Sequence, residues 1–219
     1  VAYILDHSDC KVFIVDRQFH NVAIDAIAQV NREIIVIDID DKQAGLGDIP
    51  AIGKLEYESF LQTGDEGFEW IRPDDEWQAI SLNYTSGTTG NPKGVVYHHR
   101  GSYLMSMGSI TAWNMPNRLT YLYTVPMFHC NGWGYPWTLA MLHARVIFIR
   151  NIVVKEIFEL IDKYEVTHFG GAPIVLNMIA NAPSDDQKAL KNKVYVMTAG
   201  APPPSSILQK MESLGFEVM

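Results

Sequence analysis

The sequence predicts an α/β fold in which mostly parallel strands form sheets flanked by helices. Short runs of β-branched residues, such as 11–15, 33–37 and 194–197, alternate with longer stretches whose apolar residues recur at helical spacing. This alternation is typical of parallel βαβ units, because parallel strands need a crossover connection. Ligands of such folds bind at the carboxyl ends of the strands, so the residues that follow each strand are the first candidates for a site.

The expected elements run along the whole chain. Pro126 ends the strand before it, because proline cannot donate to a strand ladder. Residues 38–53 are expected to form a loop, and the polar segment 63–76 is a surface linker that can separate two subdomains. Strands are expected at residues 11–15, 33–37, 79–84, 95–98, 121–125, 145–149, 167–169, 194–197 and 216–219. Helices are expected within residues 1–5, 18–30, 100–112, 154–161, 173–176 and 207–214.

The composition suits a soluble globular protein and excludes several kinds of partner. Of the 219 residues, 47% are hydrophobic and 19% are charged, which is enough apolar material for a core. The net charge of −8 repels phosphate backbones, so we expect no nucleic-acid partner. No apolar run reaches the roughly 18–20 residues that a membrane span needs. Cys10 and Cys130 stand far apart and outside any CxxC pair, which favours a reduced, cytoplasmic protein.

Residues 84–94 form the most informative stretch, which reads Tyr-Thr-Ser-Gly-Thr-Thr-Gly-Asn-Pro-Lys-Gly. Three glycines, four aliphatic hydroxyls and a lysine stand together between two expected strands. Glycines let backbone N–H groups approach an anion closely, and hydroxyls donate further hydrogen bonds. Lys93 adds a positive charge that can pair with a phosphate. The pattern predicts a loop that grips a polyphosphate.

Two other interpretations of this loop fit less well. A Walker A loop requires Gly-Lys followed by Ser or Thr and then a helix, whereas Pro92 precedes Lys93 here and a β-branched run follows. A solvated hairpin turn rich in Ser, Thr and Gly is the ordinary alternative. The order of all eleven residues argues against that alternative.

The eleven-residue string resembles the phosphate-loop signature of the adenylate-forming superfamily, which includes acyl-CoA synthetases, luciferases and the adenylation domains of peptide synthetases. The resemblance covers nearly the whole chain. It implies that residues 1–219 are a partial large N-terminal AMP-binding domain, without the C-terminal catalytic domain. It also implies that a carboxylate attacks the α-phosphate of ATP to give an acyl-adenylate, before a thiol takes the acyl group.

The same resemblance implies roles for single residues of the loop. Thr85 is the implied magnesium ligand, and Lys93 is implied to stabilise the pyrophosphate that leaves. The implied nucleotide contacts are Thr85, Ser86, Gly87, Thr88, Thr89, Gly90 and Lys93.

Residues 126–135, Pro-Met-Phe-His-Cys-Asn-Gly-Trp-Gly-Tyr, follow the strand at 121–125. Taken alone, they indicate a core turn with Phe128 buried, His129 hydrogen-bonded and Trp133 packed. A Cys–His nucleophilic pair is a poor alternative, because neighbouring side chains point apart and no third orienting residue is evident. The segment resembles the aromatic motif of acyl-CoA synthetases. That resemblance implies that His129 orients the carboxylate and the α-phosphate, and that Trp133 is a gate or wall of the acyl pocket.

The residue at position 129 also bears on the substrate. Relatives that activate amino acids commonly carry Asp at this place, where it pairs with the substrate's ammonium group. A buried ammonium needs such a partner, so His129 disfavours an amino-acid substrate. The aromatic surroundings suit an uncharged tail.

Two loops nearer the C-terminal end also follow expected strands. The stretch from Phe169 to Leu176 indicates an ordinary strand–helix corner, and by resemblance it forms one side of the acyl pocket. Gly171 and Val175 are the implied substrate contacts there. Residues 198–204 form a small-residue turn against which a flat ring can lie.

The turn at 198–204 resembles the superfamily loop that takes the adenine base. Gly200, Ala201 and Pro202 are the implied adenine contacts, and Ala199 is an implied substrate contact. A helix start capped by Ser205 or Ser206 is compatible with the same segment.

The pair His98 and His99 suggests a metal site only at first sight. On a strand, neighbouring side chains point to opposite faces, so the two rings cannot bind one ion. The sequence contains no Cys/His cluster with zinc spacing. We therefore expect no metal site at these histidines.

Together these features predict an AMP-forming ligase of fatty acid metabolism, an acyl-CoA synthetase that uses ATP, Mg²⁺ and CoA. The expected substrate is a medium- or long-chain fatty acid or a small apolar acid such as 3-methylmercaptopropionate. The 219 residues alone are expected to be inactive, and a homodimer is one state open to the full-length protein. A non-catalytic nucleotide-binding module, a carrier-protein-loading relative and a luciferase-like relative remain alternatives.

Overall fold

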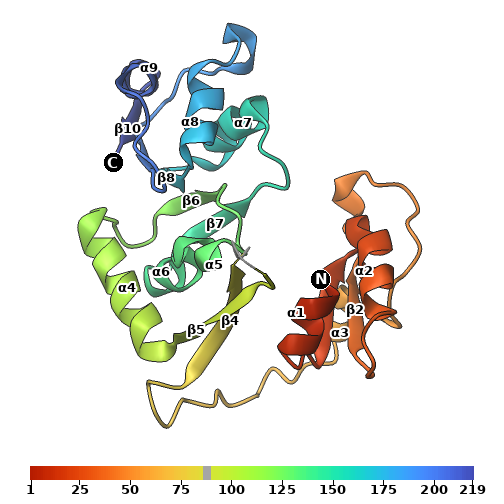
Figure 1. Cartoon of the computed structure of the whole chain (residues 1–219). Helices are drawn as coiled ribbons and strands as arrows, with labels where there is room; N and C mark the ends of the chain where they lie inside the picture. Colours follow the sequence, from red (N-terminus) through yellow and green to blue (C-terminus); the bar gives the residue numbers. More distant parts are fainter. Residues whose placement is uncertain (86–89) are drawn as a thin grey trace. The chain divides into compact units, whose positions relative to one another are not determined.

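The computed structural model describes residues 1–85 and 90–219 (Figure 1). The chain divides into two compact units, which are described separately below. The first unit comprises Val1–Asp74 and Tyr84–Val96, and the second comprises Asp75–Asn83 and Tyr97–Met219. One break between them falls inside the polar segment 63–76. The assignment of the chain as one partial domain stays a prediction.

The first unit contains a small parallel sheet with strand order β1-β2-β3. Val12 pairs with Ile35 and Ile37 pairs with Leu55, so each strand runs in the same direction as its neighbour. The elements are α1 (Ala2–His7), β1 (Val12–Asp16), the 3₁₀ turn Arg17–Phe19, α2 (His20–Ile27), β2 (Ile35–Ile39), the 3₁₀ turn Lys42–Ala44, β3 (Leu55–Glu56) and α3 (Tyr57–Leu61). The short β3 and α3 were not expected from the sequence.

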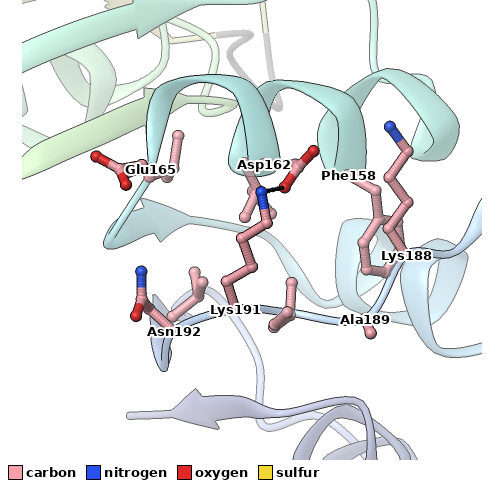
Figure 2. Close-up of a pocket in the computed structure, with 11 residues that line it drawn as sticks. Phe158, Asp162, Glu165, Lys188, Ala189, Lys191 and Asn192 are labelled. Carbon is pink, nitrogen blue, oxygen red and sulfur yellow. Dashed lines mark ion pairs between the residues drawn. The ribbon is translucent and has the colours of Figure 1, made fainter.

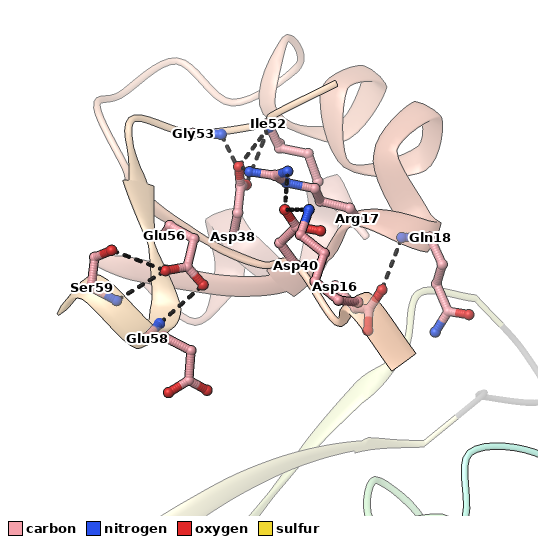
Figure 3. A network of polar contacts seen from close by, with 11 residues as sticks. Asp16, Arg17, Gln18, Asp38, Asp40, Ile52, Gly53, Glu56, Glu58 and Ser59 are labelled. Carbon is pink, nitrogen blue, oxygen red and sulfur yellow. Dashed lines mark hydrogen bonds and ion pairs between the residues drawn. The ribbon is translucent and has the colours of Figure 1, made fainter. Parts of the chain in front are cut away.

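A buried carboxylate organises this unit (Figure 3). Asp38 is 1% exposed and accepts hydrogen bonds from the backbone N–H groups of Ile52 and Gly53, both at 3.0 Å. Arg17 lies between Asp38 and Asp40, with its Nη1 2.7 Å from Asp40 Oδ2. The expectation that Asp38 begins a loop was wrong. The residue belongs to β2, because these partners satisfy the charge that would otherwise make a buried strand position costly.

The second unit is built on a five-stranded sheet with order β10-β9-β8-β6-β7. Its strands pair in parallel from β10 to β7, as the sequence predicts. The strands are β6 (Thr120–Tyr123), β7 (Arg145–Phe148), β8 (His168–Gly170), β9 (Val194–Met197) and β10 (Phe216–Val218). The helical elements are α4 (His99–Ala112), α5 (Cys130–Trp133), α6 (Tyr135–Met141), α7 (Val154–Tyr164), α8 (Pro173–Ala180), the 3₁₀ turn Ser184–Asp186 and α9 (Ser205–Ser213).

Alternate residues of β6 supply the two cores on either side of this sheet. Leu122 belongs to a cluster with apolar side chains of α7, α8 and α9. Its neighbours Tyr121 and Tyr123 belong to a second cluster with side chains of α6. Helices therefore cover both faces, which confirms the expected α/β architecture (Figure 1).

A separate two-stranded sheet consists of β4 (Ala79–Thr85) and β5 (Lys93–His98), which flank the glycine-rich loop. His98 ends β5, and its Nδ1 accepts a hydrogen bond from Gly101 N at 3.0 Å, which caps α4. His99 is the first residue of α4 and not part of a strand, so that expectation was wrong. The cap explains why the strand ends at His98 and a helix begins at His99, since it satisfies an N–H group at the helix start.

His168 lies in the middle strand of the five-stranded sheet and is 2% exposed. Its Nδ1 lies 2.8 Å from Thr167 Oγ1, and its ring stacks on Tyr195 with 5.0 Å between ring centres. Burial disfavours the charged imidazolium and lowers the pKa of His168 to about 4. The neutral ring is therefore the form that the fold accommodates.

We expect stability to fall as the pH drops from about 6.5 to about 4. In this window the unfolded chain protonates His168 and the folded protein does not, so acid favours unfolding by roughly 3 kcal/mol at the low end. His168→Phe keeps a ring against Tyr195 and should remove this part of the dependence of the unfolding free energy on pH. Urea unfolding of wild type and variant at several pH values measures the difference. The same pH dependence of the unfolding free energy in both proteins would contradict the role of a buried, neutral His168.

Candidate active site

The carboxyl ends of three adjacent strands, β6, β8 and β9, meet at a cavity of about 290 Å³. Each strand is followed by a loop that contributes to the wall. The lining residues are Thr124, Val125, Pro126, His129, Trp133, Ala172, Pro173, Val175, Ala199, Gly200 and Ala201. The cavity thus lies where parallel sheets of this type place their ligands.

The loops are tied together at the strand ends. Thr124 Oγ1 donates a buried hydrogen bond to the carbonyl of Gly170, and Gly171 N donates to Met197 O at 2.8 Å. A Cβ at Gly170 would come within 2.7 Å of Tyr121 Oη, so only glycine allows the two strands to approach here. These contacts give the cavity a rigid base.

The wall that carries His129 and Trp133 has an unusual backbone. Cys130, Asn131, Gly132, Trp133 and Gly134 have φ values between 43° and 72°, which makes the segment 130–134 a left-handed turn. Non-glycine residues pay about 1–2 kcal/mol each for this conformation. Such strain persists only where surrounding contacts over-determine it, and it is common at functional sites.

Several hydrogen bonds hold the left-handed turn. Within it, Gly134 N donates to Asn131 O at 3.0 Å. From outside, Ser81 Oγ lies 3.1 Å from Asn131 Oδ1, and Tyr123 Oη donates to Gly132 O at 3.1 Å. A Cβ at Gly132 would lie 2.1 Å from Tyr123 Oη, so position 132 needs glycine for space as well as for φ.

The turn carries Trp133 into the cavity wall, with His129 just before it. Trp133 is half-buried and also packs against the core that contains Tyr135, at 6.4 Å between ring centres. Phe128 is 85% exposed, so the interpretation of the segment as a turn with Phe128 buried was wrong. The sequence shows the glycines of this segment but not that five successive residues turn left-handed.

The structure brings together most of the residues implied for substrate and adenine. His129, Trp133, Val175, Ala199, Gly200 and Ala201 all line the cavity. Gly171 and Pro202 do not line it, although the residue next to each one does. Gly171 instead lies buried against Leu176, whose Cδ1 would be 2.8 Å from a Cβ at this position.

The implied phosphate loop is only partly described. Thr85 ends β4 and Lys93 begins β5, and both side chains are exposed. Gly90 has a φ of 136°, which favours glycine. These three residues belong to the first unit. Ser86, Gly87, Thr88 and Thr89 lie outside the described residues, so their roles stay predictions.

Five lining residues were not predicted from the sequence: Thr124, Val125, Pro126, Ala172 and Pro173. The available signal was their place directly after β6 and β8. Among the lining residues His129 carries the one titratable side chain, and none is a carboxylate. The wall therefore suits an uncharged group, with His129 and Thr124 as its polar side chains.

A second hollow lies between α7 and the segment 188–192, at the amino ends of β8 and β9 (Figure 2). Lys191 Nζ pairs with Asp162 Oδ1 at 2.6 Å across it. Its volume is about 20 Å³, which is room for roughly one water molecule. It is too small to compete with the first cavity as a ligand site.

Within residues 1–85 and 90–219, no three His, Cys, Asp or Glu side chains gather in a way that could hold a metal ion. In the same ranges no helix is long and apolar enough to cross a bilayer. Both thiols, Cys10 and Cys130, are free.

We expect Gly132→Ala to destabilise the protein by about 1–3 kcal/mol. The added methyl group meets Tyr123 Oη at 2.1 Å and imposes a side chain on a left-handed residue. Urea unfolding measures the change. Gly108→Ala in α4 is the matched control, because its Cβ would meet nothing within 4 Å and a mid-helix alanine is favoured. Equal effects of the two substitutions would rule out the strained turn.

Curated relatives match the whole chain. It is 45% identical to the peroxisomal acetate/butyrate–CoA ligase AAE7 of Arabidopsis thaliana, 43% to the acetate–CoA ligase CCL3 of Humulus lupulus and 41% to its 2-methylpropanoate–CoA ligase CCL4. Each match covers 100% of this chain and 40% of the relative, so the chain spans about two fifths of their length.

Solved structures share the fold. The N-terminal domain of FACL13 from Mycobacterium tuberculosis is 23% identical with a TM-score of 0.73, over 99% of this chain and 51% of that one. The o-succinylbenzoate coenzyme A synthetase of Bacillus subtilis, solved in complex with ATP and magnesium, is 18% identical with a TM-score of 0.66, over 97% of this chain and 50% of that one. Among protein families, the one described as AMP-binding enzyme matches residues 1–219. The chain belongs to the AMP-binding enzyme family.

Proposed function

We propose that the full-length protein activates a carboxylic acid with ATP and transfers the acyl group to coenzyme A. The observation that carries this proposal is the cavity at three strand ends, which combines one imidazole with apolar walls. The family membership and the names of the relatives, three of them CoA ligases at 41–45% identity, support it. The proposal concerns the whole protein, of which this chain supplies part.

In this proposal His129, the titratable residue of the lining, binds the substrate. A carboxylate oxygen attacks the α-phosphorus of ATP, the bond to the β-phosphate oxygen breaks, and pyrophosphate leaves. The sulfur of CoA then attacks the acyl carbon and AMP leaves. His129 orients the carboxylate by a hydrogen bond, which makes the two reacting groups part of one complex.

The remaining contacts follow the sequence assignments. Gly200, Ala201 and Pro202 take the adenine ring, and Ala199 and Gly171 lie on the substrate side. Lys93 and the residues from 85 to 90 bind the phosphates. The Thr85 hydroxyl, exposed at the end of β4, would be the ligand that this chain contributes to Mg²⁺, beside phosphate oxygens and water. The ion would neutralise charge on the leaving pyrophosphate.

For the acid, we propose an uncharged aliphatic tail against Trp133 and Val175. Absence of a carboxylate among the lining residues leaves a substrate ammonium without a partner. Two length classes compete. The sequence favours a medium- or long-chain acid or 3-methylmercaptopropionate, whereas the relatives' names carry acetate, butyrate and 2-methylpropanoate. We favour the short acids, because those relatives match the entire chain.

The test is AMP and pyrophosphate release by the full-length protein with a panel of acids. The panel runs from acetate and 2-methylpropanoate to palmitate, with 3-methylmercaptopropionate and an amino acid included. We expect CoA-dependent AMP formation that is fastest with short uncharged acids. Adenylate formation without CoA transfer would favour a carrier-protein-loading or luciferase-like activity. ATP binding with no turnover of any acid would favour a nucleotide-binding module.

Two further assignments accompany this function. A cytoplasmic location stays a prediction, and the peroxisomal location named for the Arabidopsis relative is the alternative. A tagged full-length protein seen in cells distinguishes the two. A homodimer also stays a prediction. Measuring the mass of the full-length protein in solution tests it.

We expect Lys93→Ala in the full-length protein to lower turnover about tenfold to a thousandfold, as losses of single charge-stabilising donors do. The assay is pyrophosphate release at saturating acid. Lys191→Ala is the control, because that exposed lysine sits at the amino ends of the strands and pairs only across a small hollow. A Lys93 variant as active as the control would remove the phosphate assignment.

A further inference from the structure

Tyr123 occupies the last position of β6 and contacts the left-handed turn 130–134 through Gly132. Its side chain is 5% exposed. The ring stacks on Phe148 of β7 with 5.6 Å between centres, and meets Tyr121 edge-on, also at 5.6 Å. The ring is thus fixed from two neighbouring positions of the sheet. Only its hydroxyl points to the turn.

That hydroxyl makes one well-defined contact. Tyr123 Oη donates to the carbonyl of Gly132 at 3.1 Å, in a buried environment. Burial raises the pKa of Tyr123 to about 12, so the hydroxyl keeps its proton and remains a donor at any physiological pH. Gly132 stands in the middle of the turn 130–134, and a Cβ there would overlap this hydroxyl.

The bonded carbonyl belongs to the peptide unit that leads into Trp133. Because a peptide is planar, fixing the carbonyl of residue 132 also fixes the N–H and Cα of residue 133. Trp133 lines the cavity from this Cα. A left-handed turn without such support would relax toward the right-handed conformation that L-residues prefer.

We propose that Tyr123 is a positioning residue, whose hydrogen bond to Gly132 holds Trp133 in the cavity wall and thereby sets which acyl tails the site accepts. This inference rests on the proposed function, since it names the device that determines the width of the same cavity. Tyr123 does not line the cavity and acts through Trp133.

The ordinary alternative is that Tyr123 only fills the core. Tyr123→Phe separates the two, because it keeps the ring contacts with Phe148 and Tyr121 and removes the hydroxyl. Tyr121→Phe is the matched control. It removes an even more deeply buried hydroxyl from the same strand and face, and leaves the bond between Tyr123 and Gly132 in place.

The first measurement is the acid profile of the full-length enzyme. For Tyr123→Phe we expect kcat/KM for the preferred acid to fall about threefold to tenfold, as the loss of one buried hydrogen bond implies. The kcat/KM values of longer or branched acids should rise relative to that of the preferred acid. The KM for ATP should stay within about twofold of the wild-type value. Tyr121→Phe should keep the wild-type profile. An unchanged profile in Tyr123→Phe would overturn the proposal.

A double-mutant cycle then tests whether Tyr123 acts through Trp133. We expect Tyr123→Phe to alter the acid profile in the presence of Trp133 and to add nothing in a Trp133→Ala background. Independent, additive effects would show that Tyr123 acts by another route and would overturn the proposal.

A third readout does not need activity, so it separates failure of this inference from failure of the proposed function. The fluorescence of Trp133 is obtained as the difference between each protein and its Trp133→Phe counterpart. We expect Tyr123→Phe to raise the quenching of this signal by acrylamide, and Tyr121→Phe to leave it unchanged. An inactive wild type would refute the acyl-CoA synthetase assignment, whereas an unchanged Trp133 signal would refute the positioning role.

Discussion

The parallel pairing of β8 with both of its neighbours is the constraint on which the second unit depends. This strand is only three residues long and is buried throughout, between β6 and β9. His168 pairs with Tyr121 on one side and with Tyr195 on the other. A shift of one residue would exchange the faces of His168 and Phe169, which would put an imidazole into the apolar core. The same register brings three strand ends to one edge.

A second constraint acts on the backbone of the wall. Residues 130–134 are left-handed, and the cost for Cys130, Asn131 and Trp133 is several kcal/mol in sum. Glycines at 132 and 134 reduce the cost, and contacts from β4, β6 and α6 offset more of it. The result is a tryptophan that projects from a fixed backbone and not from a loop free to adjust. The backbone of the wall therefore resists changes in the position of the Trp133 ring.

The electrostatics of the cavity complement this shape. Its lining contains an imidazole and otherwise small, apolar or hydroxyl-bearing groups, so it supplies little charge of its own. The net charge of −8 on residues 1–219 does not by itself attract a polyphosphate. In the proposed function, ATP is therefore recognised by local groups, of which the sequence places a dense set between β4 and β5. The cavity lies in the second unit, and the described residues of the loop, Thr85, Gly90 and Lys93, belong to the first.

The sequence alone determined the α/β class, most strand positions and the segments that form the cavity. These follow from local patterns: alternating β-branched runs and helical spacing are visible without any partner, and a loop that follows a parallel strand lies at a known edge. The glycine-rich string from 84 to 94 identified the family for the same reason, since its glycines, hydroxyls and lysine all lie within eleven consecutive residues. Asp38 and His99 were placed wrongly, because the contacts that decide them, to Ile52 and Gly53 in one case and the His98–Gly101 cap in the other, are not visible in the local pattern.

Only the tertiary structure decided the handedness of residues 130–134 and the residues that support them. Tyr123 of β6, Ser81 of β4 and Thr138 of α6 all bond to residues of the turn, and Ser81 does so from 50 residues away in the sequence. Asparagine tolerates that conformation, but no local preference favours it for Cys130 and Trp133. The exposure of Phe128 and the burial of Gly171 against Leu176 also became visible only in the structure. Such features depend on which elements pack against each other in the folded protein, and a short stretch of sequence does not show this.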